Sequence, residues 1–284
     1  MTNLNVTLVT GGRGKTGRRI SSKLKELQYS VRTTGRSNRS DQTDSDYVRF
    51  DWYDESTYPA ALSDVSNVYM IAPVGDMNPV NIMEPFIKKA IENGVKRFVL
   101  LSSASISENG PVLGEVHQVI KQLAPEWTVL QPSYFMENFT ESHHAGTIKN
   151  NNAIYSAAGD GKIGFVSAND IADVAVRALT DKQPHNTAHV ITGPQSLTYG
   201  DVAQILNFAL GKSIKHISLS DKKLQEALTQ AGIPNVYAEF LAGLDAKIRE
   251  EGSENQVTDT VMRVTGHAPL SFEQFVKMHL DTWN

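Results

Sequence analysis

The sequence contains no cysteine, and this absence excludes several kinds of chemistry at once. Without cysteine the chain has no disulfide bridge, no thiolate nucleophile and no zinc site built from thiolates. It also lacks an apolar run near the about 18 residues that span a bilayer, and its first residues lack the basic and apolar segments of a signal peptide. We therefore expect a soluble, cytoplasmic protein without a membrane partner.

Clustered positive charge is missing as well. The chain has 27 Lys and Arg against 31 Asp and Glu, a net charge of −4, and no segment gathers its basic residues. Because nucleic-acid-binding surfaces need such clusters, the sequence disfavours a nucleic-acid partner. The 284 residues, 40% of them hydrophobic, suffice for a packed interior. We expect a monomer or homodimer that acts on a small molecule.

Apolar, β-rich runs alternate with helix-period segments from residue 4 to about residue 132. This alternation predicts βαβ units and a parallel sheet with helices on both faces. We therefore predict a Rossmann-type, doubly wound α/β fold whose dinucleotide-binding core covers residues 1–132. The six predicted strands of this core are NVTLVT (5–10), YSVRTT (29–34), YVRFDW (47–52), NVYMIAP (67–73), RFVLLSSAS (97–105) and WTVLQPS (127–133).

The alternation loosens over residues 133–284. Residues 133–165 are polar and rich in Gly and Asn, which indicates a long loop covering the substrate. Elements of the Rossmann core then return: a helix over 167–181, capped by Ser167 or Asn169, and a seventh strand over 188–194. Helical periodicity in the remainder predicts a smaller, mostly helical substrate lobe, although the whole remains a single NAD(P)-binding domain.

The stretch TGGRGKTG, residues 10–17, follows the first predicted strand and opens a helix. A P-loop requires a glycine five positions before its Gly-Lys pair, and that position is Val9, so a nucleoside triphosphate site is excluded. Gly11, Gly14 and Gly17 instead follow a variant of the dinucleotide-binding spacing. Gly11 would turn the chain, Gly14 would let the backbone approach a pyrophosphate, and Gly17 would let the helix pack closely.

The end of the second predicted strand decides between NAD and NADP. An acid there binds the ribose 2′-hydroxyl of NAD, whereas a basic residue accommodates the 2′-phosphate of NADP. Arg36 occupies this position with Arg39 nearby, and the nearest acids, Asp41 and Asp44, come later. The sequence therefore favours NADP(H). The predicted cofactor-binding residues are Gly11, Gly12, Arg13, Gly14, Lys15, Thr16, Gly17, Arg36, Asp51, Trp52, Ala72, Pro73, Ser102, Ser103 and Pro132.

No tyrosine in the chain is followed by a lysine four residues later, so the acid pair of common short-chain reductases is absent. His117 and Lys121 have that spacing on the helix after the fifth strand. They could transfer a proton or hold the cofactor, or they could form the exposed polar face of an amphipathic helix. The Asp51 carboxylate could equally contact adenine or form an Asx turn at the end of its strand. No metal-binding motif accompanies His143 and His144.

The segment PSYFMENF, residues 132–139, follows the sixth predicted strand. Its aromatic residues and single carboxylate would suit the wall of a substrate site. We predict Tyr134, Phe135, Met136 and Phe139 as substrate-binding residues and Glu137, with His117 and Lys121, as a catalytic candidate.

Six blocks, GGRGKTG, RFVLLSSASI, NGPVLGEVH, TVLQPSYFMENF, residues 154–181 and HNTAHVITGP, resemble the NmrA-like, atypical short-chain dehydrogenases. More narrowly, they resemble the ergot-alkaloid reductases, the clade of agroclavine dehydrogenase and festuclavine synthase. The resemblance implies NADP(H) held by the glycine turn and Arg36, and a substrate side that includes Tyr134, Phe135 and Met136. Lys121 departs from the alkaloid enzymes, which leaves an identical substrate in question.

The resemblance also implies a reason for the missing tyrosine. A cyclic iminium already carries its proton or alkyl group, so hydride addition needs no acid, and a cation suits aromatic faces and a carboxylate. The predicted activity is thus NADPH-dependent reduction of an iminium or a similarly activated C=N or C=C. Two alternatives stay open: an NADPH-dependent reductase of quinones or conjugated carbonyls, and a non-catalytic, NADP-sensing regulator.

Overall fold

The computed structural model describes residues 6–37 and 46–283, so Arg39, Asp41 and Asp44 lie outside the described residues. Two compact units divide the chain. The first comprises residues 1–131 and 171–189, and the second comprises residues 132–170 and 190–284. No helix of the described part is long and apolar enough to cross a membrane.

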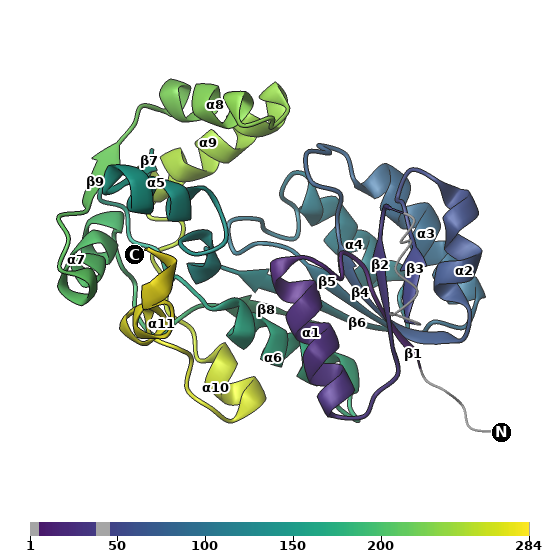
Figure 1. Ribbon diagram of the computed structural model, residues 1–284. Helices are drawn as coiled ribbons and strands as arrows, with labels where there is room; N and C mark the ends of the chain where they lie inside the picture. Colours follow the sequence, from purple (N-terminus) through teal and green to yellow (C-terminus); the bar gives the residue numbers. More distant parts are fainter. Residues whose placement is uncertain (1–5, 38–45, 284) are drawn as a thin grey trace. The chain divides into compact units, whose positions relative to one another are not determined.

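The first unit is built on a sheet whose strand order among the described residues is β3-β2-β1-β4-β5-β6-β8 (Figure 1). Each described pairing from β3 to β6 is parallel, and the order reverses beside β1, which confirms the predicted Rossmann-type α/β fold. All seven predicted strands are present, as β1 (Val6–Val9), β2 (Val31–Gly35), β3 (Tyr47–Arg49), β4 (Val65–Ile71), β5 (Arg97–Leu101), β6 (Glu126–Pro132) and β8 (Thr187–Ile191).

Helices cover both faces of this sheet (Figure 1). The core on one face packs the strands against α2, α3 and α4. Within it the rings of Phe50 and Tyr58 stack, and both meet the ring of Phe86 edge to face. On the other face, the 2.7 Å ion pair between Lys23 and Asp173 joins α1 to α6. These helices are α1 (Lys15–Glu26), α2 (Tyr58–Leu62), α3 (Val80–Glu92), α4 (Leu113–Leu123) and α6 (Ala168–Thr180).

Local signals in the sequence explain most helix ends. Gly94, which follows the end of α3, has a left-handed φ of 91°, and Gly211 ends α7 in the same region of backbone space. Of the two cap candidates for α6, the Ser167 hydroxyl accepts from the Asn169 N–H at 3.1 Å, so Ser167 is the cap.

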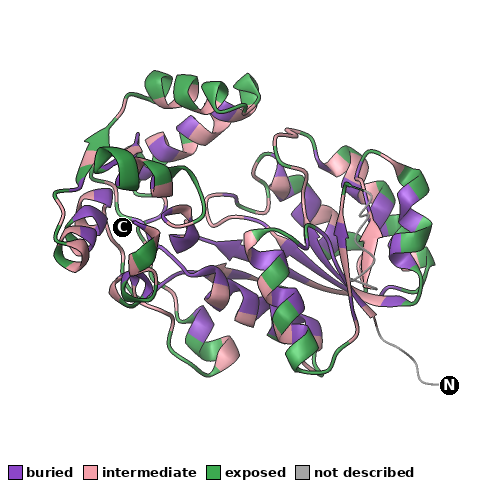
Figure 2. Cartoon of the chain, viewed as in Figure 1, coloured by how far each residue is buried: buried purple, intermediate pink, exposed green. Residues whose placement is uncertain are grey.

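The second unit has its own core of buried aromatic residues, centred on Phe139, Phe165, Tyr199 and Phe272. Figure 2 shows buried residues on α7, α9 and α11, whereas α8 has none. Within residues 133–156, one helix and one strand replace part of the predicted long loop, and this strand pairs with a second one at residues 215–218 to form a two-stranded parallel sheet. The elements are α5 (His143–Asn151), β7 (Ala153–Ser156), α7 (Tyr199–Leu210), β9 (Lys215–Ser218), α8 (Asp221–Gln230), α9 (Asn235–Glu251), α10 (Thr260–Thr265) and α11 (Phe272–Met278), with 3-10 turns at Met136–Asn138 and Leu280–Thr282. A further 3-10 turn, Glu55–Thr57, lies in the first unit.

Candidate nucleotide-binding pocket

A pocket of about 640 Å³ lies at the carboxyl ends of β1 to β4 in the first unit. Each of these four strands contributes the residues that follow it, because the carboxyl ends of parallel strands meet at one edge of a sheet. The lining consists of Gly11, Arg13, Gly14 and residues 34–37, 50–53 and 71–74.

The glycine turn shapes one wall of this pocket. Gly11 has a φ of +60°, so the chain leaves β1 in the left-handed region that favours glycine. Any side chain at Gly17 would overlap the Gly11 carbonyl, so only glycine lets α1 start against the turn. Gly14 is the N-cap residue of α1, no side chain caps it, and no acid occupies the first turn. The amide groups and dipole of this helix end therefore face the pocket without a carboxylate in their own turn, which suits an anion.

Threonine hydroxyls hold the turn in place. Thr10 Oγ1 accepts from the Ile71 N–H at 2.8 Å, and the Tyr69 hydroxyl, on a fully buried ring, hydrogen-bonds Thr16 Oγ1 at 2.9 Å. The Gly12 N–H donates to the Thr34 carbonyl at 3.2 Å. Thr16 and Gly12, which were predicted to bind the cofactor, are buried and make these hydrogen bonds within the protein. They therefore position the glycine turn and do not line the pocket.

Positive charge gathers where β2 ends. Arg13 and Arg36 both line the pocket and are exposed. Neither forms an ion pair among the described residues, and the pocket-lining residues that follow β2, Arg36 and Ser37, include no acid. Lys15, in contrast, is half-buried and does not line the pocket. Two arginines without a carboxylate partner in the described part of the chain form a suitable site for a phosphate, whose geometry matches the guanidinium fork.

The opposite wall comes from the segments after β3 and β4. Asp51 makes the Asx turn that was one of its two alternatives, since its Oδ1 accepts from the Tyr53 N–H at 3.1 Å. Trp52 is buried and donates its indole N–H to the Ile71 carbonyl at 3.1 Å. Tyr53, which the sequence analysis missed, is 65% exposed, lines the pocket and donates its hydroxyl to Asp76 at 2.8 Å. Partial desolvation of the hydroxyl and the Asp76 carboxylate raise the Tyr53 pKa to about 12, so the phenol is protonated.

Other lining residues missed by the sequence analysis are Thr34, Gly35, Ser37, Phe50, Ile71 and Val74. They lie next to residues that were predicted, at the ends of the same strands. The rule that parallel strands deliver a ligand site at their carboxyl ends could have found them.

The predicted residues at the end of β5 lie outside this pocket lining. Ser102 is buried at the end of that strand, and its Oγ has no hydrogen-bond partner among the described residues. Ser103 Oγ accepts from the Ser105 N–H at 3.3 Å. Pro132, at the end of β6, is buried. An orphaned, buried hydroxyl is uncommon and is consistent with a bound group that would satisfy it.

The two candidate proton donors on α4 have different surroundings. His117 is 3% exposed, packs 5.7 Å from the Trp127 ring, and leaves its Nε2 without a hydrogen-bond partner among the described residues. Burial, partly opposed by Glu108, lowers the pKa of His117 from its ordinary 6.5. Lys121 is exposed and paired with Glu108 at 2.9 Å. The alternative of an exposed polar face thus fits Lys121 but not His117.

The segment predicted to face substrate divides into partly exposed and buried residues. Tyr134 and Phe135 are partly exposed, and Tyr134 donates its hydroxyl to Asp245 at 3.1 Å. Met136 and Phe139 are buried in the aromatic core of the second unit. Glu137 is fully buried, and its Oε2 accepts from the Ala168 N–H at 2.8 Å, at the start of α6. Its contacts give it a helix-capping role rather than that of an accessible carboxylate.

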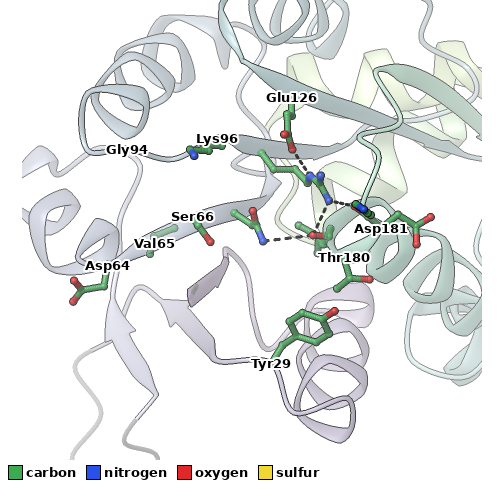
Figure 3. A pocket seen from close by; sticks show the side chains of 13 residues that line it. Tyr29, Asp64, Val65, Ser66, Gly94, Lys96, Glu126, Thr180 and Asp181 are labelled. Atoms are coloured by element: carbon green, nitrogen blue, oxygen red, sulfur yellow. Dashed lines mark hydrogen bonds and ion pairs between the residues drawn. The ribbon is translucent and has the colours of Figure 1, made fainter. Parts of the chain in front are cut away.

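A second pocket of the first unit, about 690 Å³, lies at the opposite, amino ends of β4, β5 and β6 (Figure 3). Arg97 spans it, with hydrogen bonds to Glu126 at 2.6 Å and to the carbonyls of Leu179 and Asp181. These bonds tie the end of α6 to the sheet, and ligands of open α/β sheets bind at the other edge. We therefore assign this pocket no ligand.

Residues 4–268 match the family model of the NmrA-like family, so the chain belongs to that family. The uncharacterized oxidoreductase YesF of Bacillus subtilis is 44% identical and aligns with 98% of this chain and 96% of its own. Agroclavine dehydrogenase of Claviceps fusiformis is 40% identical, over 97% of this chain and 98% of its own. The triphenylmethane reductase of Citrobacter sp., solved with NADP(H), has a TM-score of 0.79 at 21% identity, covering 96% and 99% of the two chains.

Proposed function

We propose that this protein is an NADPH-dependent oxidoreductase that transfers hydride to an iminium, or to a similarly activated C=N or C=C, of a small cyclic, alkaloid-like substrate. One observation carries the cofactor assignment: a single pocket is lined by a glycine-shaped, uncapped helix start and by two arginines that form no ion pair among the described residues. The first feature suits a pyrophosphate and the second suits a 2′-phosphate.

Several of the predicted residues would hold this cofactor. Gly11 and Gly14 would admit the pyrophosphate, while Arg13 and Arg36 would bind the 2′-phosphate. Tyr53, Ala72, Pro73 and Val74 offer an apolar and aromatic wall that suits adenine. When bound, NADPH supplies the hydride. The free hydroxyl of Ser102, at the end of β5, is available to hydrogen-bond the cofactor or the substrate.

The groups near α4 favour an acceptor that needs no acid. Lowering of its pKa by burial keeps His117 neutral at neutral pH, and Lys121 is held by Glu108. An alkylated iminium accepts hydride without proton transfer, so the contribution of the protein is orientation and exclusion of water. The similarity to agroclavine dehydrogenase, 40% identity over 97% of this chain, supports a substrate of this kind.

Tyr134 and Phe135 are proposed as substrate-side residues because they are partly exposed. The burial of Met136, Glu137 and Phe139 in the second unit weighs against direct roles for them, and we leave them out of the mechanism. The cation would then be stabilised by aromatic faces rather than by the Glu137 carboxylate.

The test is a steady-state screen with purified protein, in which loss of NADPH absorbance is followed with two acceptors. N-methyl-3,4-dihydroisoquinolinium represents a permanently charged iminium, and menadione represents a quinone. We expect turnover of the iminium, with NADPH preferred over NADH. Turnover of menadione alone, abolished in Lys121→Ala, would support the quinone alternative instead. NADP⁺-dependent capture of a protein without turnover of any acceptor would support the regulator.

A further inference from the structure

We propose that Tyr47, the first residue of β3, determines cofactor specificity by positioning Arg13 and the turn that carries Arg36. The inference rests on the proposed function, because it concerns recognition of the 2′-phosphate of NADPH. Tyr47 does not line the pocket, and no sequence motif marks it.

The ring of Tyr47 supports the guanidinium of Arg13. The central carbon of this guanidinium lies 5.4 Å from the ring centroid, within the range of a cation–π interaction. Arg13 is exposed and has no ion pair among the described residues, so the ring is the contact that restrains it. A long side chain loses rotamer freedom when it binds a ligand, and a restrained arginine loses less.

The hydroxyl of the same residue holds the turn after β2. It donates to the Ser37 carbonyl at 2.7 Å, immediately after Arg36. β2 and β3 are parallel neighbours in the sheet, with Tyr47 opposite Thr33 and Arg49 opposite Gly35 (Figure 1). Tyr47 therefore links β3 directly to Arg13 and, through the Ser37 carbonyl, to the turn that carries Arg36.

The residue at position 35 makes this arrangement possible. A Cβ added to Gly35 would lie 2.8 Å from the Tyr47 hydroxyl oxygen, closer than van der Waals contact allows. The phenol consequently passes over the glycine to reach Ser37. Gly35→Ala should displace the ring and reproduce the effect of replacing Tyr47.

A selective change in affinity distinguishes positioning from folding. Only NADPH carries the 2′-phosphate, so loss of Tyr47 should weaken NADPH and leave NADH nearly unchanged. A role limited to stabilising the sheet would change both affinities together. Tyr47→Phe retains the ring beside Arg13 and removes the hydroxyl with its bond to Ser37, whereas Tyr47→Leu removes the ring and the hydroxyl together.

The experiment measures dissociation constants of NADPH and NADH by calorimetry for the folded protein and its variants. We expect the NADPH preference to fall about fivefold in Tyr47→Leu, the size of an exposed cation–π contact, and about twofold in Tyr47→Phe. Tyr29→Leu, which replaces a partly exposed tyrosine outside the pocket, should leave the preference unchanged. In an Arg13→Ala background, Tyr47→Leu should have a smaller effect, because the two residues act together.

An unchanged preference in both Tyr47 variants would overturn the inference, as would an equal loss of both nucleotides. If Tyr47→Leu does not fold, Tyr47→Phe decides in the same way. Equal binding of NADPH and NADH by the wild-type protein would contradict the proposed cofactor. A wild-type preference for NADPH that stays unchanged in the Tyr47 variants would contradict only the role of Tyr47.

Discussion

Replacement of Arg36 by alanine tests the proposed phosphate site most directly. Arg36 lines the pocket at the end of β2, is exposed, and has no ion pair among the described residues. Its removal therefore breaks no salt bridge within residues 6–37 and 46–283, so the fold should be retained. The side chain should contact only the 2′-phosphate, and the substitution should weaken NADPH while sparing NADH.

The exposure of Arg36 determines how much NADPH affinity the substitution should cost. A hydrogen bond to a charged group contributes about 1.5 to 3 kcal/mol, which corresponds to about 10- to 150-fold in affinity. Because Arg36 is exposed, water and salt screen it, and we expect the lower end, about tenfold. Arg13 remains in the variant and should preserve part of the preference. The effect should shrink further as ionic strength rises.

Calorimetric titration of NADPH, NADH and 2′,5′-ADP gives the required affinities, because the last compound carries the 2′-phosphate without nicotinamide. Binding of 2′,5′-ADP should weaken as much as binding of NADPH. Arg177→Ala is the control, since this arginine is half-exposed on α6 and lies outside the pocket. Equal loss of NADPH and NADH, or no loss of either, would refute this placement of the phosphate.

Four further predictions follow from contacts described above. Gly17→Ala should destabilise the fold by about 1 to 3 kcal/mol through overlap with the glycine turn, and should weaken NADPH binding in calorimetry. Gly146→Ala on α5 is the control: the added Cβ meets nothing within 4 Å, so the change should be neutral or stabilising when both variants are unfolded with urea. Glu137→Ala should cost about 1 to 3 kcal/mol in urea unfolding, because it leaves the buried N–H at the start of α6 unsatisfied. Lys121→Met should leave iminium turnover within about threefold of wild type, since its exposed ion pair is worth at most about 1 kcal/mol.

The pH dependence of stability gives a further prediction for His117. Burial lowers its folded pKa below the ordinary 6.5, so the unfolded chain binds the proton more tightly. Its contribution to stability is therefore complete above pH 6.5 and is lost as the pH falls toward the folded pKa. The free energy of unfolding of the wild-type protein, measured with urea, should fall over that pH range by more than that of His117→Phe. An identical pH dependence of the two proteins would contradict the assigned burial.

The seven strands of the Rossmann sheet were predictable because each is an apolar run bounded by turn residues, and the pattern is local. Two elements of the second unit, α5 and β7, were missed within residues 133–165, and β9 was missed later in the chain. β7 and β9 are four-residue strands that pair with each other across some 60 residues, Ala153 opposite Lys215, and no local periodicity specifies such a partner. Helix α5 contains Gly146, a weak helix former, and several polar residues.

The sequence by itself determined the family resemblance, the order of strands and helices, the glycine turn and the basic residue after β2. All of these depend on neighbours within a few positions along the chain. Only the tertiary structure decided which side chains of the aromatic segment are buried, that Glu137 caps α6, and that Tyr47 meets Arg13 and Ser37. The physical reason is that the contacts of a side chain depend on elements that folding brings beside it. The sequence around a glutamate therefore does not show whether its carboxylate will face a ligand or a helix end.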